Sequence, residues 1–389
     1  MRVLLIGGAR PNFVKLAPLY REAQKYDQIC CKVVHTGQHY DYEMSQSFFE
    51  DLDLSEPHFF LNSGSGSHAV QTAKIMMAFE EVCQSERPDM AVVVGDVNST
   101  LACSIVGKKL LIEVAHIEAG LRSFDLTMPE EINRMVTDSI SDYFFVTEES
   151  GIKNLLKEGK PKDKIHFVGN VMIDNLFYQL EKLRSENSER FPSVRLKEEN
   201  RNYAFLTLHR PSNVDLKEHF VEISGALNHI AEEMPIFFPV HPRTKKMMDQ
   251  FDIKLSTDIF LLPPLGFKES LFLWKDAQVV LTDSGGLQEE TTALGVPCIT
   301  LRENTERPIT VDMGTNIVAG TKKESILSAF RKSIERRGEK LAVPPKWDGK
   351  ASERIWKVLL ETKHGRRGNR RYLLASDFMV KGIKSEAAV

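Results

Sequence analysis

The sequence lacks several features that mark special classes of protein. Its 389 residues include five cysteines, and no two of them form a CxxC pair. This spacing argues against a zinc site or a disulfide framework and fits reduced thiols in a cytoplasmic protein. No apolar run reaches the ~18 residues that a transmembrane helix needs. The net charge of -3 provides no basic field for nucleic acid.

Motifs of several enzyme classes are also missing. No HExxH, GxSxG or P-loop pattern occurs. The segment GGARPNFVK is not a dinucleotide fingerprint, and no lone acid ends the following predicted strand, so NAD binding is disfavoured. The first residues, MRVLLIGG, run straight into a predicted strand without the layout of a signal peptide. We therefore expect a cytoplasmic protein that does not insert into membranes.

The chain does contain a regular alternation of apolar runs and amphipathic stretches. The runs predict strands at 3–6, 32–36, 90–94, 111–116, 143–146 and 165–168. The amphipathic stretches predict helices at 15–24, 44–52, 69–85, 99–109, 131–141 and 151–157. Such alternation predicts a parallel sheet with helices on both faces.

A charged interval at 183–202 separates this half from a second one, and it predicts a helix end plus a linker. Strands are then predicted at 203–208, 236–239, 259–262, 279–281, 298–301 and 316–318. Helices are predicted at 216–232, 243–249, 267–275, 286–293, 323–334 and 351–361. The length fits two domains, which we expect at 1–180 and 203–350, with a tail at 363–389.

Charged side chains follow two neighbouring predicted strands of the first half. Asp96 follows one strand, Glu118 follows the next, and Glu130 comes after a proline in MPEEINR. Ligands of an open parallel sheet bind beyond the carboxyl ends of its strands. We therefore expect three carboxylates around one crevice, where crowding favours proton chemistry or pairing with cations. Taken singly, Asp96 could cap a helix and Glu118 could pair with Arg122.

A second group of residues is typical of an anion site. The segment DSGGLQEE takes a strand through Ser284, Gly285 and Gly286 into a helix, whose N–H groups and dipole favour phosphate. Glu290, in the first turns of that helix, could accept hydrogen bonds from a diol such as a ribose. A glycine-rich helix cap without a ligand would have the same sequence pattern.

Basic and histidine side chains follow further strands. The cations Arg10 and Lys15 of GGARPNFVK and Arg307 of RENTERP suit an anionic ligand, although each could lie in a solvated turn. His209 and His241 each end a strand of the second half. A histidine there can act as acid or base near neutral pH, or it can be purely structural.

Seven motifs, in this order, resemble the UDP-N-acetylglucosamine 2-epimerase family, and the likeness runs from Met1 to about Thr362. They are GDVNST, HIEAGLRS, PEEINR, LHRPSNVD, FPVHPR, TDSGGLQEE and ENTERPIT. The resemblance implies an α/β fold of GT-B type. In it, two Rossmann-like domains enclose the active site in their cleft, and a C-terminal helix at about 351–362 packs back on the first domain. It also implies a homodimer, no metal and no cofactor.

The implied reaction is the reversible epimerisation of UDP-N-acetylglucosamine to UDP-N-acetylmannosamine at carbon 2. UDP is eliminated to leave a 2-acetamidoglucal and is then added back. The catalytic residues that the resemblance implies are Asp96, Glu118, Glu130 and His209. The substrate-binding residues are Arg10, Lys15, Arg210, His241, Ser284, Gly285, Gly286, Glu290 and Arg307. We expect crowding to raise the pKa of one acid, Glu118 or Asp96, so that it serves as the base.

Two departures from the family pattern leave the substrate and the regulation open. After His209, Arg210-Pro211-Ser212-Asn213 stands where many bacterial members read Arg-Arg-Glu. This segment is closer to archaeal-type and modified-sugar members, so the exact sugar stays open. Gln38 is kept but Asp41 replaces a second Gln, so activation by a second UDP-N-acetylglucosamine stays open. Three rival functions also stay open, namely a UDP-sugar glycosyltransferase, a hydrolysing epimerase and a nucleotide-sugar sensor.

Overall fold

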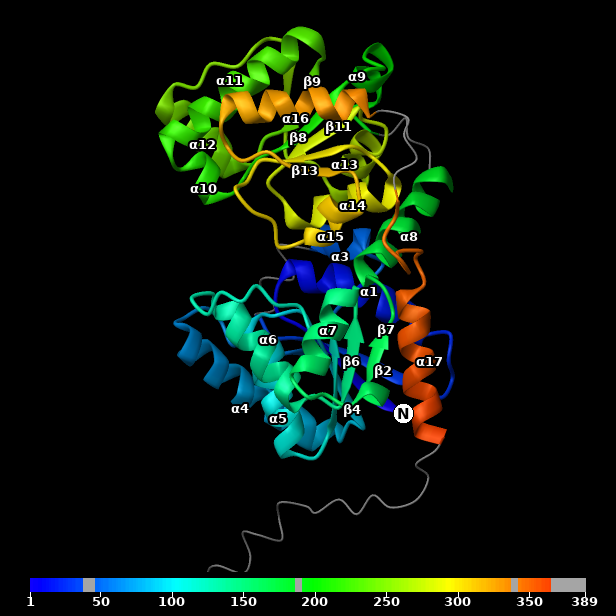
Figure 1. Cartoon of the computed structure of the whole chain (residues 1–389). Helices are drawn as coiled ribbons and strands as arrows, with labels where there is room; N and C mark the ends of the chain where they lie inside the picture. The colour runs from blue at the N-terminus through cyan, green and yellow to red at the C-terminus, as the bar shows by residue number, and fades with distance from the viewer. Residues whose placement is uncertain (38–45, 186–190, 337–341, 365–389) are drawn as a thin grey trace, which may run out of the picture.

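Two parallel β-sheets, each covered by helices, form two lobes (Figure 1). The structure is a computed structural model, and it describes residues 1–37, 46–185, 191–336 and 342–364. Within these ranges, one sheet has seven strands and the other has six, and every strand pair is parallel. The prediction of two α/β halves with parallel sheets is confirmed.

The first sheet has the strand order β3-β2-β1-β4-β5-β6-β7. Its strands are β1 (Arg2–Gly7), β2 (Cys30–His35), β3 (Phe59–Phe60), β4 (Met90–Val94), β5 (Glu113–Ile117), β6 (Tyr143–Val146) and β7 (Ile165–Phe167). The helices of this part are α1 (Arg10–Ala23), α3 (Gln46–Asp51), α4 (His68–Glu86), α5 (Asn98–Lys109), α6 (Pro129–Ile140), α7 (Glu149–Lys157), the 3-10 turn η1 (Lys162–Lys164) and α8 (Val171–Ser185).

The second sheet has the order β10-β9-β8-β11-β12-β13. Its strands are β8 (Ala204–Thr207), β9 (Ile236–Pro239), β10 (Ile259–Leu262), β11 (Val279–Thr282), β12 (Cys298–Thr300) and β13 (Asn316–Val318). The helices are α9 (Val194–Glu199), α10 (Pro211–Val214), α11 (Lys217–Glu233), α12 (Pro242–Phe251), α13 (Phe267–Trp274), α14 (Gly285–Leu294), α15 (Pro308–Asp312) and α16 (Lys323–Glu335), followed by α17 (Ala351–His364).

Alternate residues of each central strand enter separate cores, because successive side chains of a strand point to opposite faces. In β1, Val3 and Leu5 join the core that contains α1 and α17, while Leu4 and Ile6 join the core under α4 and α5. Both faces are therefore buried, which explains why these strands read as continuous apolar runs.

The described residues of the interval at 183–202 are more structured than predicted. The helix end belongs to α8, a helix of 15 residues, and α9 lies inside the segment assigned to a linker. The tertiary contacts of α9 include Lys197, whose Nζ bonds the carbonyl of Phe272 and the carboxylate of Asp276. Such long-range contacts leave no periodic trace in the sequence. The motif residues Gln38 and Asp41 and the tail after His364 lie outside the described residues.

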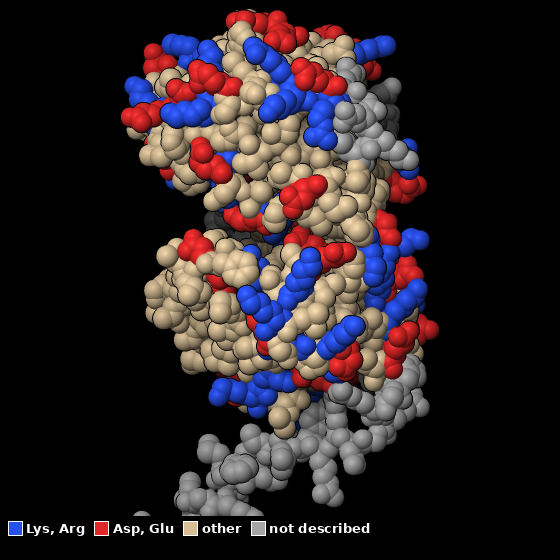
Figure 2. Space-filling model, in the orientation of Figure 1, with Lys and Arg blue, Asp and Glu red and all other residues tan. Residues whose placement is uncertain are grey.

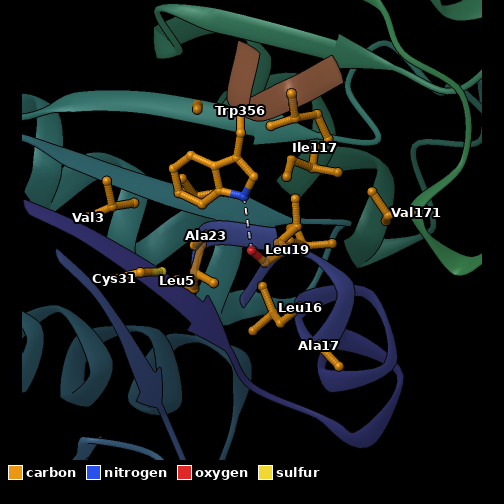
Figure 3. Packing of buried hydrophobic residues seen from close by; sticks show 14 of the residues in the cluster. Val3, Leu5, Leu16, Ala17, Leu19, Ala23, Cys31, Ile117, Val171 and Trp356 are labelled. Carbon is orange, nitrogen blue, oxygen red and sulfur yellow. Dashed lines mark hydrogen bonds between the residues drawn. The ribbon is translucent and has the colours of Figure 1, made fainter. Parts of the chain in front are cut away.

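The last helix, α17, packs against the first lobe (Figures 1 and 3). Trp356 is fully buried there, and its Nε1–H donates a hydrogen bond of 2.9 Å to the carbonyl of Leu19 in α1. The carboxylate of Asp174 in α8 caps the start of α17 by accepting bonds from the amides of Ala351 (3.0 Å) and Ser352 (2.6 Å). No helix among the described residues is long and apolar enough to span a bilayer.

Replacing Trp356 with Ala is expected to destabilise the first lobe by about 3–5 kcal/mol, because it opens a large cavity and removes the hydrogen bond from Nε1–H to the Leu19 carbonyl. Thermal and urea unfolding of the purified variant measure the loss. The exposed Lys357 of the same helix is the control, and its replacement by Ala should cost about 0.5 kcal/mol or less. Equal losses for the two variants would contradict the role of Trp356 as an anchor.

Candidate active site

The two sheets turn their topological switch points toward each other. Strand order reverses between β1 and β4 in one sheet and between β8 and β11 in the other. Ligands of open parallel sheets bind beyond the carboxyl ends of the strands at such points. A cavity of about 700 Å³ lies there, and Figure 2 shows a notch between the lobes with acidic and basic side chains in it.

Most of the predicted site residues line this one cavity. They come from both lobes and are Arg10, Lys15, His209, Arg210, His241, Ser284, Gly285, Gly286, Glu290 and Arg307. Asp96, Glu118 and Glu130 are not among the lining residues, although Glu118 contacts one of them. The lining includes four cations, Arg10, Lys15, Arg210 and Arg307, against three acids, Glu289, Glu290 and Glu306. The cavity therefore suits an anionic ligand that reaches both lobes.

The glycine pair after β11 opens α14 toward the cavity. A Cβ added to Gly285 would have no heavy atom within 4 Å, so the backbone here faces open space. The preceding residue, Ser284, makes no side-chain cap hydrogen bond. The first amides of a helix have no intrahelical acceptor, and the helix dipole adds positive potential. This turn can therefore bind a phosphate through its amides.

Glu118 lies behind Lys15 in a buried ion pair. The Nζ of Lys15 is 2.5 Å from Oε2 of Glu118, and the two side chains are 9% and 5% exposed. Glu118 has a φ of 67°, a left-handed backbone conformation that is uncommon for a residue with a side chain. Such conformations cluster at functional sites, where the surrounding structure holds them in place.

Two expectations for Glu118 are wrong. It does not pair with Arg122, which instead bonds Asp138 (2.7 Å) and Glu158 (2.8 Å). Crowding also does not raise its pKa. Burial pushes the pKa upward, but Lys15, then Arg307 and His116, stabilise the carboxylate and bring the pKa below its ordinary value. Glu118 is therefore ionised at neutral pH.

The other two predicted acids, like Glu118, do not line the first cavity. Asp96 pairs with Arg134 of α6 at 2.5 Å. Glu130 lines a second, polar cavity of about 460 Å³ together with Gly8 and Ala9, which directly precede Arg10 of the first cavity. The linings of the two cavities thus include consecutive residues at the start of α1. The neighbouring Glu131 is structural, because it accepts the amides of Ser123 and Phe124, each at 3.0 Å.

Asp283 is a site residue that the sequence pattern alone did not identify. It is fully buried, and its Oδ1 lies 2.9 Å from Nδ1 of His209. Its Oδ2 accepts the amides of His209 (2.9 Å) and Arg210 (2.7 Å). Asp283 therefore holds the backbone of His209 and Arg210 through Oδ2 and lies in ion-pair contact with the ring through Oδ1, which accepts no hydrogen bond from any described residue. Its position directly before the Ser-Gly-Gly turn was the signal available in the sequence.

Glu290 also lines the cavity, and burial, then the charge of Glu289, raises its pKa from 4.5 to about 8. Because the folded-state pKa lies above the unfolded value, ionising this acid between pH 4.5 and 8 costs folding free energy, and stability falls as pH rises through that window.

Glu290→Gln removes this cost. The variant should match the wild type near pH 5 and should be more stable by up to a few kcal/mol near pH 8.5.

Thermal unfolding of both proteins from about pH 5 to about pH 8.5 checks this expectation. Glu353→Gln is the control, since Glu353 lies on the exposed side of α17 in an i,i+4 pair with Lys357. That control should keep the pH dependence of the wild type. Parallel curves for wild type and Glu290→Gln would contradict the burial of an acid with a raised pKa.

Comparison with known proteins decides the family. A family model described as UDP-N-acetylglucosamine 2-epimerase matches residues 21–360. The chain belongs to this family. It is 43% identical over 372 residues to the UDP-N-acetylglucosamine 2-epimerase of Methanocaldococcus jannaschii, which covers 94% of this chain and 100% of that protein. It is also 37% identical over 337 residues to the Pseudomonas aeruginosa UDP-2,3-diacetamido-2,3-dideoxy-D-glucuronate 2-epimerase, covering 86% of this chain and 92% of that protein.

Solved structures of the epimerase family agree with this assignment. The crystal structure of the Methanocaldococcus jannaschii enzyme in complex with UDP-GlcNAc and UDP has a TM-score of 0.79 at 43% identity and covers 93% of this chain and 100% of that one. The Neisseria meningitidis enzyme bound to UDP-GlcNAc has a TM-score of 0.83 at 31% identity, with coverage of 93% and 100%. With the two parallel sheets, these matches confirm the predicted GT-B architecture.

Proposed function

We propose that this protein reversibly converts UDP-N-acetylglucosamine to UDP-N-acetylmannosamine by epimerisation at carbon 2, without metal or nicotinamide. The observation that carries the proposal is a cavity that joins the amide turn at Gly285 to the buried pair of Lys15 and Glu118. A nucleoside diphosphate suits the first part and proton chemistry suits the second. The relatives are named as enzymes that act on or bind UDP-HexNAc sugars, and this supports the same substrate class.

The diphosphate would bind the N-terminus of α14, with Arg10 and Arg307 close by. Glu290 would accept hydrogen bonds from the ribose hydroxyls. In the elimination, a base removes the proton from carbon 2 and a double bond forms between carbons 1 and 2. The bond between carbon 1 and the phosphate oxygen breaks, and its electron pair leaves with UDP. The helix dipole and the arginines stabilise this charge. UDP then adds back to carbon 1 while carbon 2 receives a proton on the opposite face.

Glu118 is our choice for the base, because it is ionised, buried and held in place by Lys15. Asp96, paired with Arg134, is the alternative base, and Glu130 would assist from the second cavity. His209, whose ring contacts Asp283, would orient or protonate the leaving phosphate. Closure of the lobes would keep water from the glycal intermediate.

Incubation with UDP-N-acetylglucosamine alone in heavy water tests the proposal. Proton NMR should show UDP-N-acetylmannosamine with deuterium at carbon 2, both before and after treatment with EDTA. Free N-acetylmannosamine and UDP would indicate a hydrolysing epimerase, and no reaction without an acceptor would indicate a glycosyltransferase. A modified UDP-HexNAc is the second candidate substrate, favoured by the 37% identical Pseudomonas relative. Exchange with a 2,3-diacetamido sugar but not with UDP-N-acetylglucosamine would identify it.

We also propose that the chain forms a cytoplasmic homodimer. The first lobe carries exposed apolar side chains around α4 and α6, and the same region is largely free of charge in Figure 2. These exposed apolar side chains are Val70, Met77, Phe124, Leu126, Ile132 and Met135. A partner would remove this surface from water. Light scattering should give twice the chain mass of 44.2 kDa, and Met77→Glu should lower it. Cell fractionation tests the location.

A further inference from the structure

Glu289 is a buried carboxylate of the cavity to which the sequence assigned no role. It lies in α14 and is 4% exposed. Its Oε1 accepts a hydrogen bond of 2.9 Å from Nδ2 of Asn170 and lies 3.0 Å from Nε of Arg307. Its Oε2 is buried without a hydrogen-bond donor. An unsatisfied carboxylate oxygen costs free energy, so an acid kept in this buried position suggests a function.

Arg307 is the cation that Glu289 holds. It lines the cavity with Gly285 and lies within electrostatic range of Glu118 and Asp96, which both belong to the opposite lobe. Its charge therefore acts in two directions. Toward the glycine turn it favours an anionic diphosphate, and toward Glu118 it favours the carboxylate form.

Glu289 opposes the second of these effects. Lys15 and Arg307 both lower the pKa of Glu118 and so make it a weaker base. The negative charge of Glu289 offsets Arg307 and also repels the carboxylate of Glu118, whose own charge raises the pKa of Glu289. The charged groups that face Glu289 from the surrounding elements are Arg307, Glu118, Lys15, Glu148 and its neighbour Glu290.

We propose that Glu289 is a positioning residue that aims Arg307 at the diphosphate and offsets the charge that Arg307 directs at Glu118, the base for carbon 2. This inference deepens the proposed function and rests on it. Without the charge of Glu289, Arg307 has more charge available for the diphosphate, while Glu118 becomes a weaker base. Binding of UDP and the rate of the chemical step should therefore change in opposite directions.

Glu289→Gln tests this separation, since Gln keeps the size of the side chain and an oxygen for Asn170 but removes the charge. Titration calorimetry should show UDP bound at least as tightly as by the wild type. Steady-state kinetics should show kcat lowered about tenfold or more. The acid limb of kcat/KM against pH should move to lower pH, because the base then has a lower pKa.

Two further variants separate positioning from a structural role. Asp174→Asn changes a buried acid that caps α17 outside the cavity, so it should lower the melting temperature and leave the pH profile unchanged. Glu289→Asp keeps the charge but shortens the reach to Arg307, so it should keep the acid limb of the wild type while UDP binds less tightly. Should Glu289→Gln fail to fold, this variant carries the test.

Several outcomes overturn the inference. One is an acid limb of kcat/KM against pH that does not move in Glu289→Gln. Another is a loss of UDP affinity in the same variant. The third is an acid limb that shifts in Glu289→Asp. If the wild type forms no epimerised product, the proposed function fails independently. Calorimetry with UDP then tests only the part that concerns Arg307: binding by Glu289→Gln that is equal or tighter supports it, and weaker binding overturns it.

Discussion

Glu118→Gln is expected to lower kcat about a thousandfold, because the variant removes the carboxylate that we assign as base and keeps the shape of the side chain. The amide oxygen of Gln can still accept the hydrogen bond from Lys15, which is now 2.5 Å from Oε2. The site should therefore still bind UDP. Product formation from UDP-N-acetylglucosamine and exchange of deuterium into carbon 2 are the two measurements.

The buried charge of Lys15 provides the control for this variant. Removing one partner of a buried ion pair leaves the other uncompensated and costs about 3–5 kcal/mol. Lys15→Met combined with Glu118→Gln should recover part of that stability but none of the activity. Normal exchange at carbon 2 in Glu118→Gln would remove Glu118 as base and leave Asp96 as the next choice. Activity restored in the double variant would reduce the role of Glu118 to stability.

The central strands were predictable because their sequences reflect their surroundings. Strand β4, with the sequence MAVVV, is buried along its whole length, and the predicted bounds 90–94 match it. Helix α8 was not predicted as a whole, because its buried residues include Asp174, Asn175 and Gln179 beside Ile173 and Leu176. It packs against α1 and α14 in different lobes, so its polar side chains are buried too and no single apolar stripe remains.

The sequence predicted which residues belong to the site, but it did not predict which of their side chains form ion pairs with each other. Strand ends identify which side chains reach the cleft, since parallel strands share one edge. The partner of Glu118 is Lys15, 103 positions away, whereas the sequence suggested the nearby Arg122. The pKa of Glu118 is shifted downward by Lys15, and is not raised by the crowding of acids. Pairings of this kind depend on how α1 lies relative to the end of β5, which local patterns do not encode.

Asp283→Asn is expected to lower kcat about a hundredfold or more, because the variant disturbs the ring of His209. Nδ1 of His209 lies 2.9 Å from Oδ1 of Asp283 in an ion-pair contact, although Oδ1 accepts no hydrogen bond from the residues that the structure describes, and Nε2 remains for the substrate. The amide group of Asn can place an NH₂ at that position, and the opposite tautomer is then favoured. The loop should persist, because one oxygen remains to accept the amides of His209 and Arg210.

A double-mutant cycle with His209→Ala distinguishes an effect on the ring from an effect on the fold. If Asp283 acts through His209, then Asp283→Asn should cause almost no further loss of kcat in the His209→Ala background. An equal loss in both backgrounds would mean that Asp283 supports the loop or the neighbouring glycine turn. The same cycle measured on UDP affinity should show little coupling, because the amides of that turn bind the diphosphate whether or not the ring is present.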